Sequence, residues 1–257
     1  MTPLRIRNLE IGEGIPKIVV PIMGAHVEAL LDSAHAALDA GADIIEWRVD
    51  FLNPLEESRI VAALGNVRDV LGETPLLFTL RSASQGGEAD LSDEAASRMI
   101  RAALATGAVD LVDIELDCAH AEELVAFAHE FGVHTVVSRH DFKATPSFDQ
   151  IYDLFQRELD AGADMAKVAV MACEEGDELR LMAACSQFAA DNPHALLVGI
   201  AMGEKGIITR VAGEFFGSCL TFCSAGDATA PGQLNAAVVR ASLAQLHESG
   251  YNPTSTE

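Results

Sequence analysis

Residues 161–170 read AGADMAKVAV and residues 40–49 read AGADIIEWRV, and this repeated pattern decides the fold. In both stretches a helical run ends at AGAD, where the glycine is typical of a helix C-cap. A short run rich in apolar residues follows, as in a buried strand. Each stretch therefore predicts a junction at which a helix delivers the chain to a strand of a parallel sheet.

The same alternation of strand and helix extends over the whole chain. Strands are predicted at residues 17–23, 43–49, 75–81, 110–116, 134–140, 164–170, 195–201 and 218–224. Eight βα units predict an α/β protein that closes into a (β/α)8, or TIM, barrel. We expect residues 1–257 to form one catalytic barrel domain, with residues 4–13 as a short hairpin that closes one mouth. An open doubly wound sheet is the alternative, but no glycine-rich phosphate loop follows the first strand.

Composition and charge narrow the classes of partner. The 257 residues are 49% hydrophobic and 5% aromatic, which predicts a core of aliphatic side chains. A formal net charge of −22 makes nucleic acid and anionic membrane surfaces poor partners. The N-terminal residues lack the apolar segment of a signal peptide, and the five cysteines are scattered without metal-site spacing. We therefore expect a cytoplasmic protein without a disulfide framework.

Unusual polar residues fall at the carboxyl ends of the predicted strands, where barrels of this kind place their active sites. Side chains alternate along a strand, so Glu46 and Arg48 share one face. The other face of that strand is apolar and suits the helix layer, so both charged side chains are expected to point into the barrel. An internal ion pair that only plugs the barrel is the structural alternative.

Lys167 is the most informative single residue, because it lies in the middle of the apolar strand DMAKVAV. On the helix-facing side it would be buried without a partner, which is costly. Facing inward, it shares a face with Met165 and Ala169. Burial there favours a neutral amine, which can attack a ketone and form an imine. The alternative is a structural ion pair with a barrel carboxylate.

His140 ends the fifth predicted strand at the barrel mouth and is suited to acid and base catalysis near neutral pH. Asp113 and Glu115 share a face of the fourth strand, and we expect one of them to orient His140. Arg48, Arg81 and Arg210 are expected to converge on the same mouth. Arginine binds carboxylates in a bidentate manner, so the site predicts an anionic ligand.

Together these segments make the chain resemble the type I 3-dehydroquinate dehydratases of the shikimate pathway. The matching stretches are PKIVVPIMG, EWRVD, LLFTLRS followed by QGGE, VDIEL, SRHDFKATP, DMAKVAVM, ITRVAGEFFGS and APGQL. They occur in the family order from one end of the chain to the other. The histidine stretch followed by the lysine strand is the most specific of these signals.

The resemblance implies dehydration of 3-dehydroquinate to 3-dehydroshikimate, by syn loss of water, in the biosynthesis of aromatic amino acids. It implies a homodimeric (β/α)8 barrel that needs no metal or organic cofactor. Lys167 would be the Schiff-base lysine, His140 the general acid and base, and Glu46 the carboxylate that works beside the histidine. The substrate-binding residues would be Arg48, Arg81, Arg210, Gln233, Thr229, Met202, Phe142 and Gln85.

The chain departs from the family pattern at three of these stretches. Many relatives have a glutamate where this chain has Gln85, which can form hydrogen bonds but cannot take up a proton. Pro21 replaces a serine, and Thr229 keeps the hydroxyl of a frequent serine. None of these departures affects Lys167 or His140, so the resemblance implies the same chemistry with altered contacts to the substrate. Gly86 and Gly87, next to Gln85, suggest a mobile lid.

Two rival functions remain open at the level of sequence. A class I aldolase also uses a barrel and an imine lysine, but it would need a phosphate-binding loop near the last strands, where Glu204 opposes phosphate. A non-catalytic protein that binds a cyclic carboxylate is the other rival. A metal hydrolase is disfavoured, because the sequence has no HxH or HExxH pair.

Overall fold

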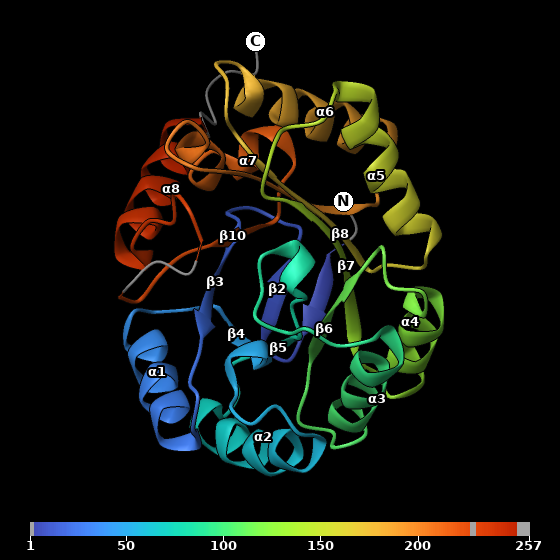
Figure 1. Ribbon diagram of the computed structural model, residues 1–257. Helices are drawn as coiled ribbons and strands as arrows, with labels where there is room; N and C mark the ends of the chain where they lie inside the picture. The colour runs from blue at the N-terminus through green and yellow to red at the C-terminus, as the bar shows by residue number, and fades with distance from the viewer. Residues whose placement is uncertain (1–2, 227–229, 251–257) are drawn as a thin grey trace.

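The computed structural model describes residues 3–226 and 230–250, in which parallel strands form a barrel surrounded by helices (Figure 1). The barrel strands are β3 (Lys17–Ile22), β4 (Ile44–Arg48), β5 (Leu76–Thr79), β6 (Leu111–Glu115), β7 (His134–Asp141), β8 (Met165–Met171), β9 (Leu196–Met202) and β10 (Leu220–Phe222). The helices are α1 (Val27–Asp39), α2 (Glu57–Leu71), α3 (Asp93–Leu104), α4 (Ala121–Glu130), α5 (Phe148–Asp160), α6 (Asp177–Asp191), α7 (Gly213–Phe216) and α8 (Ala236–Gly250). Three short 3-10 turns are η1 (Val49–Phe51), η2 (Ala83–Gln85) and η3 (Ile207–Arg210).

The strands follow one another around the barrel in the order β10-β3-β4-β5-β6-β7-β8-β9, all parallel. The two ends of this order meet at a bridge between Leu197 and Ser218, beside which the Cys219 amide donates to the Leu197 carbonyl at 2.8 Å. This arrangement confirms the predicted (β/α)8 barrel, and the open doubly wound sheet is wrong.

The predicted N-terminal hairpin is confirmed as β1 (Leu4–Ile6) paired antiparallel with β2 (Leu9–Ile11). Ile6 and Ile11 are buried in one apolar cluster with residues that point into the barrel, such as Val136. The Arg7 guanidinium donates to the carboxylate of Asp110, which precedes β6, at 2.6 Å. In Figure 1 the hairpin is seen through the middle of the barrel, so it closes the mouth at the amino ends of the strands.

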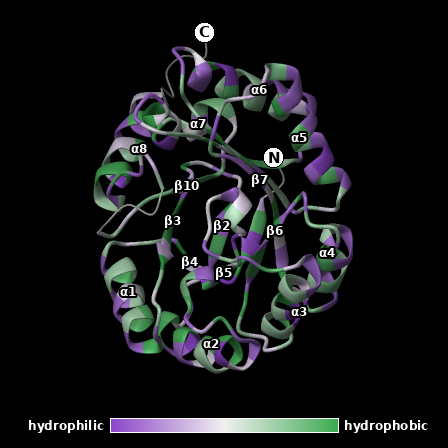
Figure 2. Cartoon of the chain, viewed as in Figure 1, coloured by the Kyte–Doolittle hydropathy of each residue, from purple (hydrophilic) through white to green (hydrophobic). Residues whose placement is uncertain are grey.

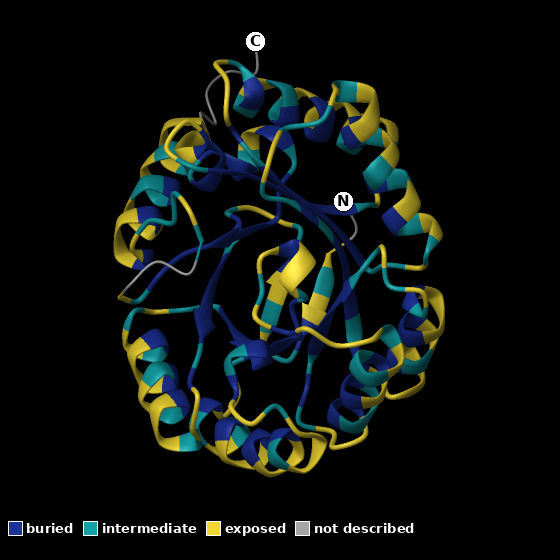
Figure 3. Ribbon diagram, in the orientation of Figure 1, coloured by how far each residue is buried: buried dark blue, intermediate teal, exposed yellow. Residues whose placement is uncertain are grey.

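Alternation along each strand separates two apolar layers. On β8, Met165 and Ala169 belong to the cluster inside the barrel, whereas Ala166 and Val168 pack in the layer beneath α5 and α6. Figure 2 shows apolar strands surrounded by helices of mixed polarity, and Figure 3 shows the strands buried. Lys167 therefore points inward with Met165 and Ala169, as predicted. Within residues 3–226 and 230–250, no helix is long and apolar enough to cross a membrane.

Glu158, on α5, is an exception inside this apolar layer. Its side chain is fully buried, and neither carboxyl oxygen has a hydrogen-bond partner among the described residues. Burial raises the pKa of the Glu158 carboxyl well above its ordinary value. A group with a raised pKa contributes its full stability below its unfolded pKa and loses it as the pH rises toward the folded pKa.

We therefore expect Glu158→Gln to be more stable than the wild type at pH 8 and to differ little from it at pH 4.5. Each unit by which folding raises the carboxyl pKa corresponds to about 1.4 kcal/mol at high pH. Urea unfolding at the two pH values measures the difference. Asp153→Asn, an exposed change on the same helix, is the control. An equal gain in both variants would show that general charge, and not burial of Glu158, is responsible.

Candidate active site

A pocket opens at the carboxyl ends of the barrel strands, opposite the hairpin. Its walls bring together most of the residues that the sequence singled out. The lining residues are Glu46, Arg48, Arg81, Gln85, Gly86, His140, Phe142, Lys167, Ala169, Ile200, Met202, Arg210, Phe222, Ala230 and Gln233. The walls combine apolar side chains with charged and amide groups, so the pocket offers both apolar contact and charge to a small ligand.

Lys167 lies in this pocket with only 3% of its surface exposed. Its Nζ is 3.1 Å from Oδ2 of Asp113 on β6 and 4.2 Å from the centre of the Phe222 ring. The ion pair between Lys167 and a barrel carboxylate, which was the structural alternative, is thus present. The same amine also lines the pocket. Lys167 pairs in register with Ser138 on β7, and His140 pairs with Ala169 on β8, so Lys167 and His140 come from adjacent strands.

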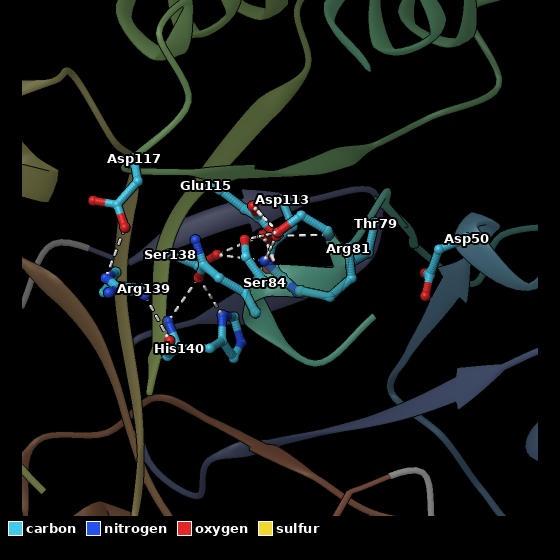
Figure 4. Close-up of polar contacts among 12 residues, drawn as sticks. Asp50, Thr79, Arg81, Ser84, Asp113, Glu115, Asp117, Ser138, Arg139 and His140 are labelled. Carbon is cyan, nitrogen blue, oxygen red and sulfur yellow. Dashed lines mark hydrogen bonds and ion pairs between the residues drawn. The ribbon is translucent and has the colours of Figure 1, made fainter. Parts of the chain in front are cut away.

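Asp113 is the centre of a buried polar cluster. Besides Lys167, it contacts the Arg81 guanidinium at 2.7 Å and accepts from the Ser138 hydroxyl at 2.6 Å (Figure 4). Burial alone would raise the pKa of Asp113, but Arg81 and Lys167 outweigh burial and hold it well below its usual range. Arg81 also donates to Glu115 at 2.9 Å. The Asp113 carboxyl therefore remains an anion and neutralises cations inside the barrel.

His140 is buried at the carboxyl end of β7 and contacts Gln85, not a carboxylate. The Gln85 Oε1 lies 2.8 Å from the His140 amide nitrogen and 3.3 Å from Nδ1. The expectation that Asp113 or Glu115 orients this histidine is therefore wrong, because Arg81 occupies both acids. Burial lowers the pKa of the His140 imidazole well below its ordinary value, and the charges of Arg81 and Lys167 act in the same direction.

The three arginines line one pocket, as predicted, but they are not equivalent. Arg48 forms a two-pronged ion pair with Asp50, at 2.9 and 2.7 Å, and Arg81 is held by Asp113 and Glu115. Arg210 differs, since among the described residues it has no carboxylate within ion-pairing distance.

The Arg210 guanidinium donates instead to the carbonyl oxygens of Phe222 and Pro231, both at 3.0 Å. Its Nε has no hydrogen-bond partner among the described residues, although the side chain is 1% exposed. Burial lowers the pKa of Arg210 to about 10, so the group remains charged at neutral pH. A buried cation without a carboxylate is a ready site for an anionic ligand.

Glu46 is buried in the pocket wall, where its Oε1 accepts from the Thr79 hydroxyl at 2.9 Å. Arg48 pairs with Asp50 and not with Glu46, so the internal Glu46–Arg48 ion pair that was the structural alternative does not form. Met202 and Phe142 supply apolar walls, and Gln233 lies beside them. Thr229, also expected at the substrate, lies outside the described residues.

The turn that carries Gln85 is packed closely against the barrel. Ser82 is tied to Glu115 through its amide, at 3.0 Å, and its hydroxyl, at 2.7 Å. At Gly86, which has a positive φ of 82°, a Cβ would overlap the Phe142 ring, and at Gly87 it would overlap the Arg81 backbone. The close packing at both positions leaves no room for a larger side chain, and the mobile lid that the sequence suggested stays a prediction.

Two residues of the site were not singled out from the sequence. Ser138 lies in register with Lys167 and donates to Asp113, and strand alternation places it on the same face as His140. Phe222 is the last residue of β10, and the centre of its ring lies 4.2 Å from the Lys167 Nζ. Alternation alone would have placed both side chains inside the barrel.

Comparison with known proteins gives a consistent result. The sequence model of a family described as type I 3-dehydroquinase matches residues 18–250. A 3-dehydroquinate dehydratase of Klebsiella pneumoniae is 43% identical over 238 residues, which are 91% of this chain and 95% of that protein. One from Listeria monocytogenes is 39% identical and covers 96% of this chain and 99% of its own length.

Solved structures agree with these sequence relatives. A type I 3-dehydroquinate dehydratase from Clostridium difficile, described with covalently modified comenic acid, has a TM-score of 0.93 at 37% identity and covers 96% of this chain and 98% of its own. A 3-dehydroquinate dehydratase from Geobacillus kaustophilus has a TM-score of 0.94 at 34% identity, over 97% and 98%. With the same motifs gathered in one pocket of the same barrel, the chain belongs to the type I 3-dehydroquinase family.

Proposed function

We propose that the chain converts 3-dehydroquinate to 3-dehydroshikimate through an imine on Lys167, with His140 as the general acid and base. Family membership supplies the reaction, a dehydration catalysed by a hydro-lyase of the shikimate pathway. One observation supports the proposed mechanism above all others. An inward lysine and a buried histidine from adjacent strands face the same pocket.

The reaction requires an electron sink, because a ketone alone only weakly acidifies the carbon beside it. Attack by Lys167 on the ketone releases one water and gives an imine, which in its protonated form withdraws electrons strongly. Phe222 and Asp113 would stabilise the positive charge on that nitrogen. The covalently modified ligand described for the Clostridium difficile relative supports a covalent step in this pocket.

His140 would then move one proton in two directions. With its pKa lowered, the imidazole is neutral at neutral pH and can take the proton from the carbon next to the imine. The imidazolium can return this proton to the hydroxyl that leaves from the next carbon, so that water departs. Hydrolysis of the product imine then takes up one water and frees both 3-dehydroshikimate and the Lys167 amine. Glu46, in the same wall, is proposed to assist the histidine.

Binding of the ring carboxylate is proposed to depend mainly on Arg210, whose guanidinium has no carboxylate partner in the described part of the chain. Arg48, Arg81 and Gln233 are proposed to contact hydroxyl or carboxylate oxygens, and Thr229 and Gln85 are proposed as further polar contacts. Met202 and Phe142 would hold the faces of the ring. Such anchoring directs the reacting carbon toward the histidine.

Three broader proposals accompany the reaction. The whole chain acts as one catalytic barrel domain, works in the cytoplasm and forms a homodimer. The exposed side chains of Leu179 on α6, Ile208 on η3 and Phe215 on α7 offer apolar surface on neighbouring elements for a second copy. Light scattering after size exclusion, at several concentrations, is expected to give twice the chain mass, and a monomer throughout would contradict the dimer.

Borohydride trapping tests the imine directly. Incubation with 3-dehydroquinate followed by reduction is expected to leave a ligand-derived adduct on Lys167, which peptide mass spectrometry would locate. Lys167→Ala should lose the adduct and nearly all turnover. Lys205→Ala, at an exposed lysine outside the pocket, should keep both. Near-normal turnover of folded Lys167→Ala would contradict the mechanism.

Arg210→Met tests the anion site. We expect the KM for 3-dehydroquinate to rise about tenfold to a hundredfold, because a charge-assisted hydrogen bond contributes about 1.5–3 kcal/mol. Steady-state kinetics at constant pH measures the change, with thermal unfolding as a check on the fold. Arg180→Met is the control, since that guanidinium also binds a backbone carbonyl, of Thr145, but lies outside the pocket. An unchanged KM in Arg210→Met would place the carboxylate elsewhere.

A further inference from the structure

Asp50 is a buried carboxylate in η1, the turn that follows β4. Its Oδ1 accepts from Arg48 Nε at 2.9 Å, and its Oδ2 accepts from Arg48 Nη2 at 2.7 Å. Two parallel hydrogen bonds between a carboxylate and a guanidinium fix the plane of the guanidinium as well as its position. Arg48 lines the pocket, whereas Asp50 does not, so Asp50 determines how a pocket cation is presented without touching the cavity itself.

A second element is bound by the same carboxylate. Its Oδ2 also accepts from the backbone N–H of Glu88 at 3.0 Å. Glu88 belongs to residues 82–90, here named the β5 loop, which follow the strand next to β4 in the barrel. Gly86 in this loop is part of the pocket wall. One buried anion therefore holds both a pocket arginine and the loop beside it.

The β5 loop is fastened on its other side in the same manner. At its start, the Ser82 amide and hydroxyl donate to Glu115 on β6, at 3.0 and 2.7 Å. Glu115 in turn accepts from Arg81 at 2.9 Å. In Figure 4, Glu115 and Asp50 lie on opposite sides of Arg81. Each edge of the loop is thus tied to a carboxylate that also holds a pocket arginine.

The shared anion makes the loop and the guanidinium depend on each other. A buried carboxylate is stabilised only while its oxygens accept hydrogen bonds, and bonds from charged donors contribute most. If the β5 loop moved away, Oδ2 of Asp50 would lose the Glu88 amide. If Arg48 turned, both oxygens would lose a charged donor. Each partner therefore helps to hold the anion that holds the other.

We infer that Asp50 is a positioning residue that couples Arg48 to the β5 loop, so that substrate held by Arg48 and a loop seated on the pocket stabilise each other. This inference rests on the proposed function, in which Arg48 contacts an oxygen of 3-dehydroquinate. Nη1 of Arg48 is not part of the fork to Asp50 and can donate to such an oxygen. The coupling is reciprocal, because the factor by which the seated loop tightens binding is also the factor by which the ligand stabilises the seated loop.

Asp50→Asn tests the coupling through steady-state kinetics. The asparagine has nearly the same shape, but its amide offers one oxygen, and its nitrogen carries hydrogens that would face a donor. We expect the KM for 3-dehydroquinate to rise about tenfold to a hundredfold, with a smaller fall in kcat, because the charge-assisted hydrogen bonds that position Arg48 are lost. An unchanged KM would overturn the inference.

Asp177→Asn is the matched control. Asp177 is also a buried acid that accepts from an arginine, Arg180, at 2.8 Å and from a loop amide, that of Cys173, at 2.9 Å. It lies outside the pocket, so its variant should keep the KM of the wild type. A rise in KM as large as that of Asp50→Asn would show that the loss of a buried carboxylate, and not of the contact with Arg48, is responsible, and would overturn the inference.

Hydrogen exchange measures the coupling in the wild type, without any variant. The backbone amide of Glu88 should exchange at least about fivefold more slowly in an equilibrium mixture of 3-dehydroquinate and 3-dehydroshikimate than in the free protein. The Cys173 amide, which donates to Asp177, should exchange at the same rate in both. In Asp50→Asn the Glu88 amide should exchange faster, and saturating ligand should no longer slow it. No slowing in the wild type, or slowing that survives in Asp50→Asn, would contradict the coupling.

The outcomes for the wild type separate this inference from the proposed function. A wild type that neither binds nor dehydrates 3-dehydroquinate would contradict the proposed function, and the coupling would fall with it. A wild type that dehydrates 3-dehydroquinate, while the Glu88 amide exchanges at the same rate with and without ligand, would overturn the role of Asp50 alone.

Discussion

The site depends on the placement of one buried anion, the Asp113 carboxylate. Isolated charges inside a protein are strongly unfavourable, so Lys167 and Arg81 need an anion beside them. Asp113 meets Lys167 at 3.1 Å and Arg81 at 2.7 Å, and accepts from Ser138 at 2.6 Å. Since Asp113 is on β6, Ser138 on β7 and Lys167 on β8, and Arg81 follows β5, this carboxylate joins the ends of four consecutive strands.

In the proposed mechanism, the same arrangement has two opposing effects on Lys167. Asp113 stabilises an ammonium form of Lys167, whereas imine formation needs the free amine. An imine nitrogen that becomes positive again faces the same carboxylate and the same Phe222 ring, so this environment stabilises the charged intermediate as well. We regard Asp113 as a group that stabilises two positive states of the Lys167 nitrogen, the ammonium before the attack on the ketone and the protonated imine after it. His140 is suited to accept the proton that Lys167 must lose between these two states.

The sequence predicted the barrel, the hairpin and most of the pocket walls, because strand alternation and the carboxyl-end rule are strong constraints. It failed where the outcome depends on which polar groups pair. Glu46 and Arg48 share a face, but Arg48 pairs with Asp50 in the turn that follows. Nothing in the residue spacing shows that Arg81 forms ion pairs with both Asp113 and Glu115. Nor does it show that Gln85, and neither acid, accepts a hydrogen bond from His140. The need for glycine at positions 86 and 87 was also hidden from the sequence, because it comes from the side chain and backbone packed against them.

The N-terminal hairpin has a consequence for how the chain folds. Ile6 and Ile11 are packed in one cluster with residues as distant in sequence as Val198 and Leu220, and Arg7 pairs with an acid 103 positions away. These contacts can form only once the barrel has been assembled, although the hairpin precedes every barrel strand in the sequence. Contacts between residues far apart in sequence slow folding, because the chain entropy is lost before the contacts form. A segment that comes before the whole barrel in the chain is thus among the last to reach its native place.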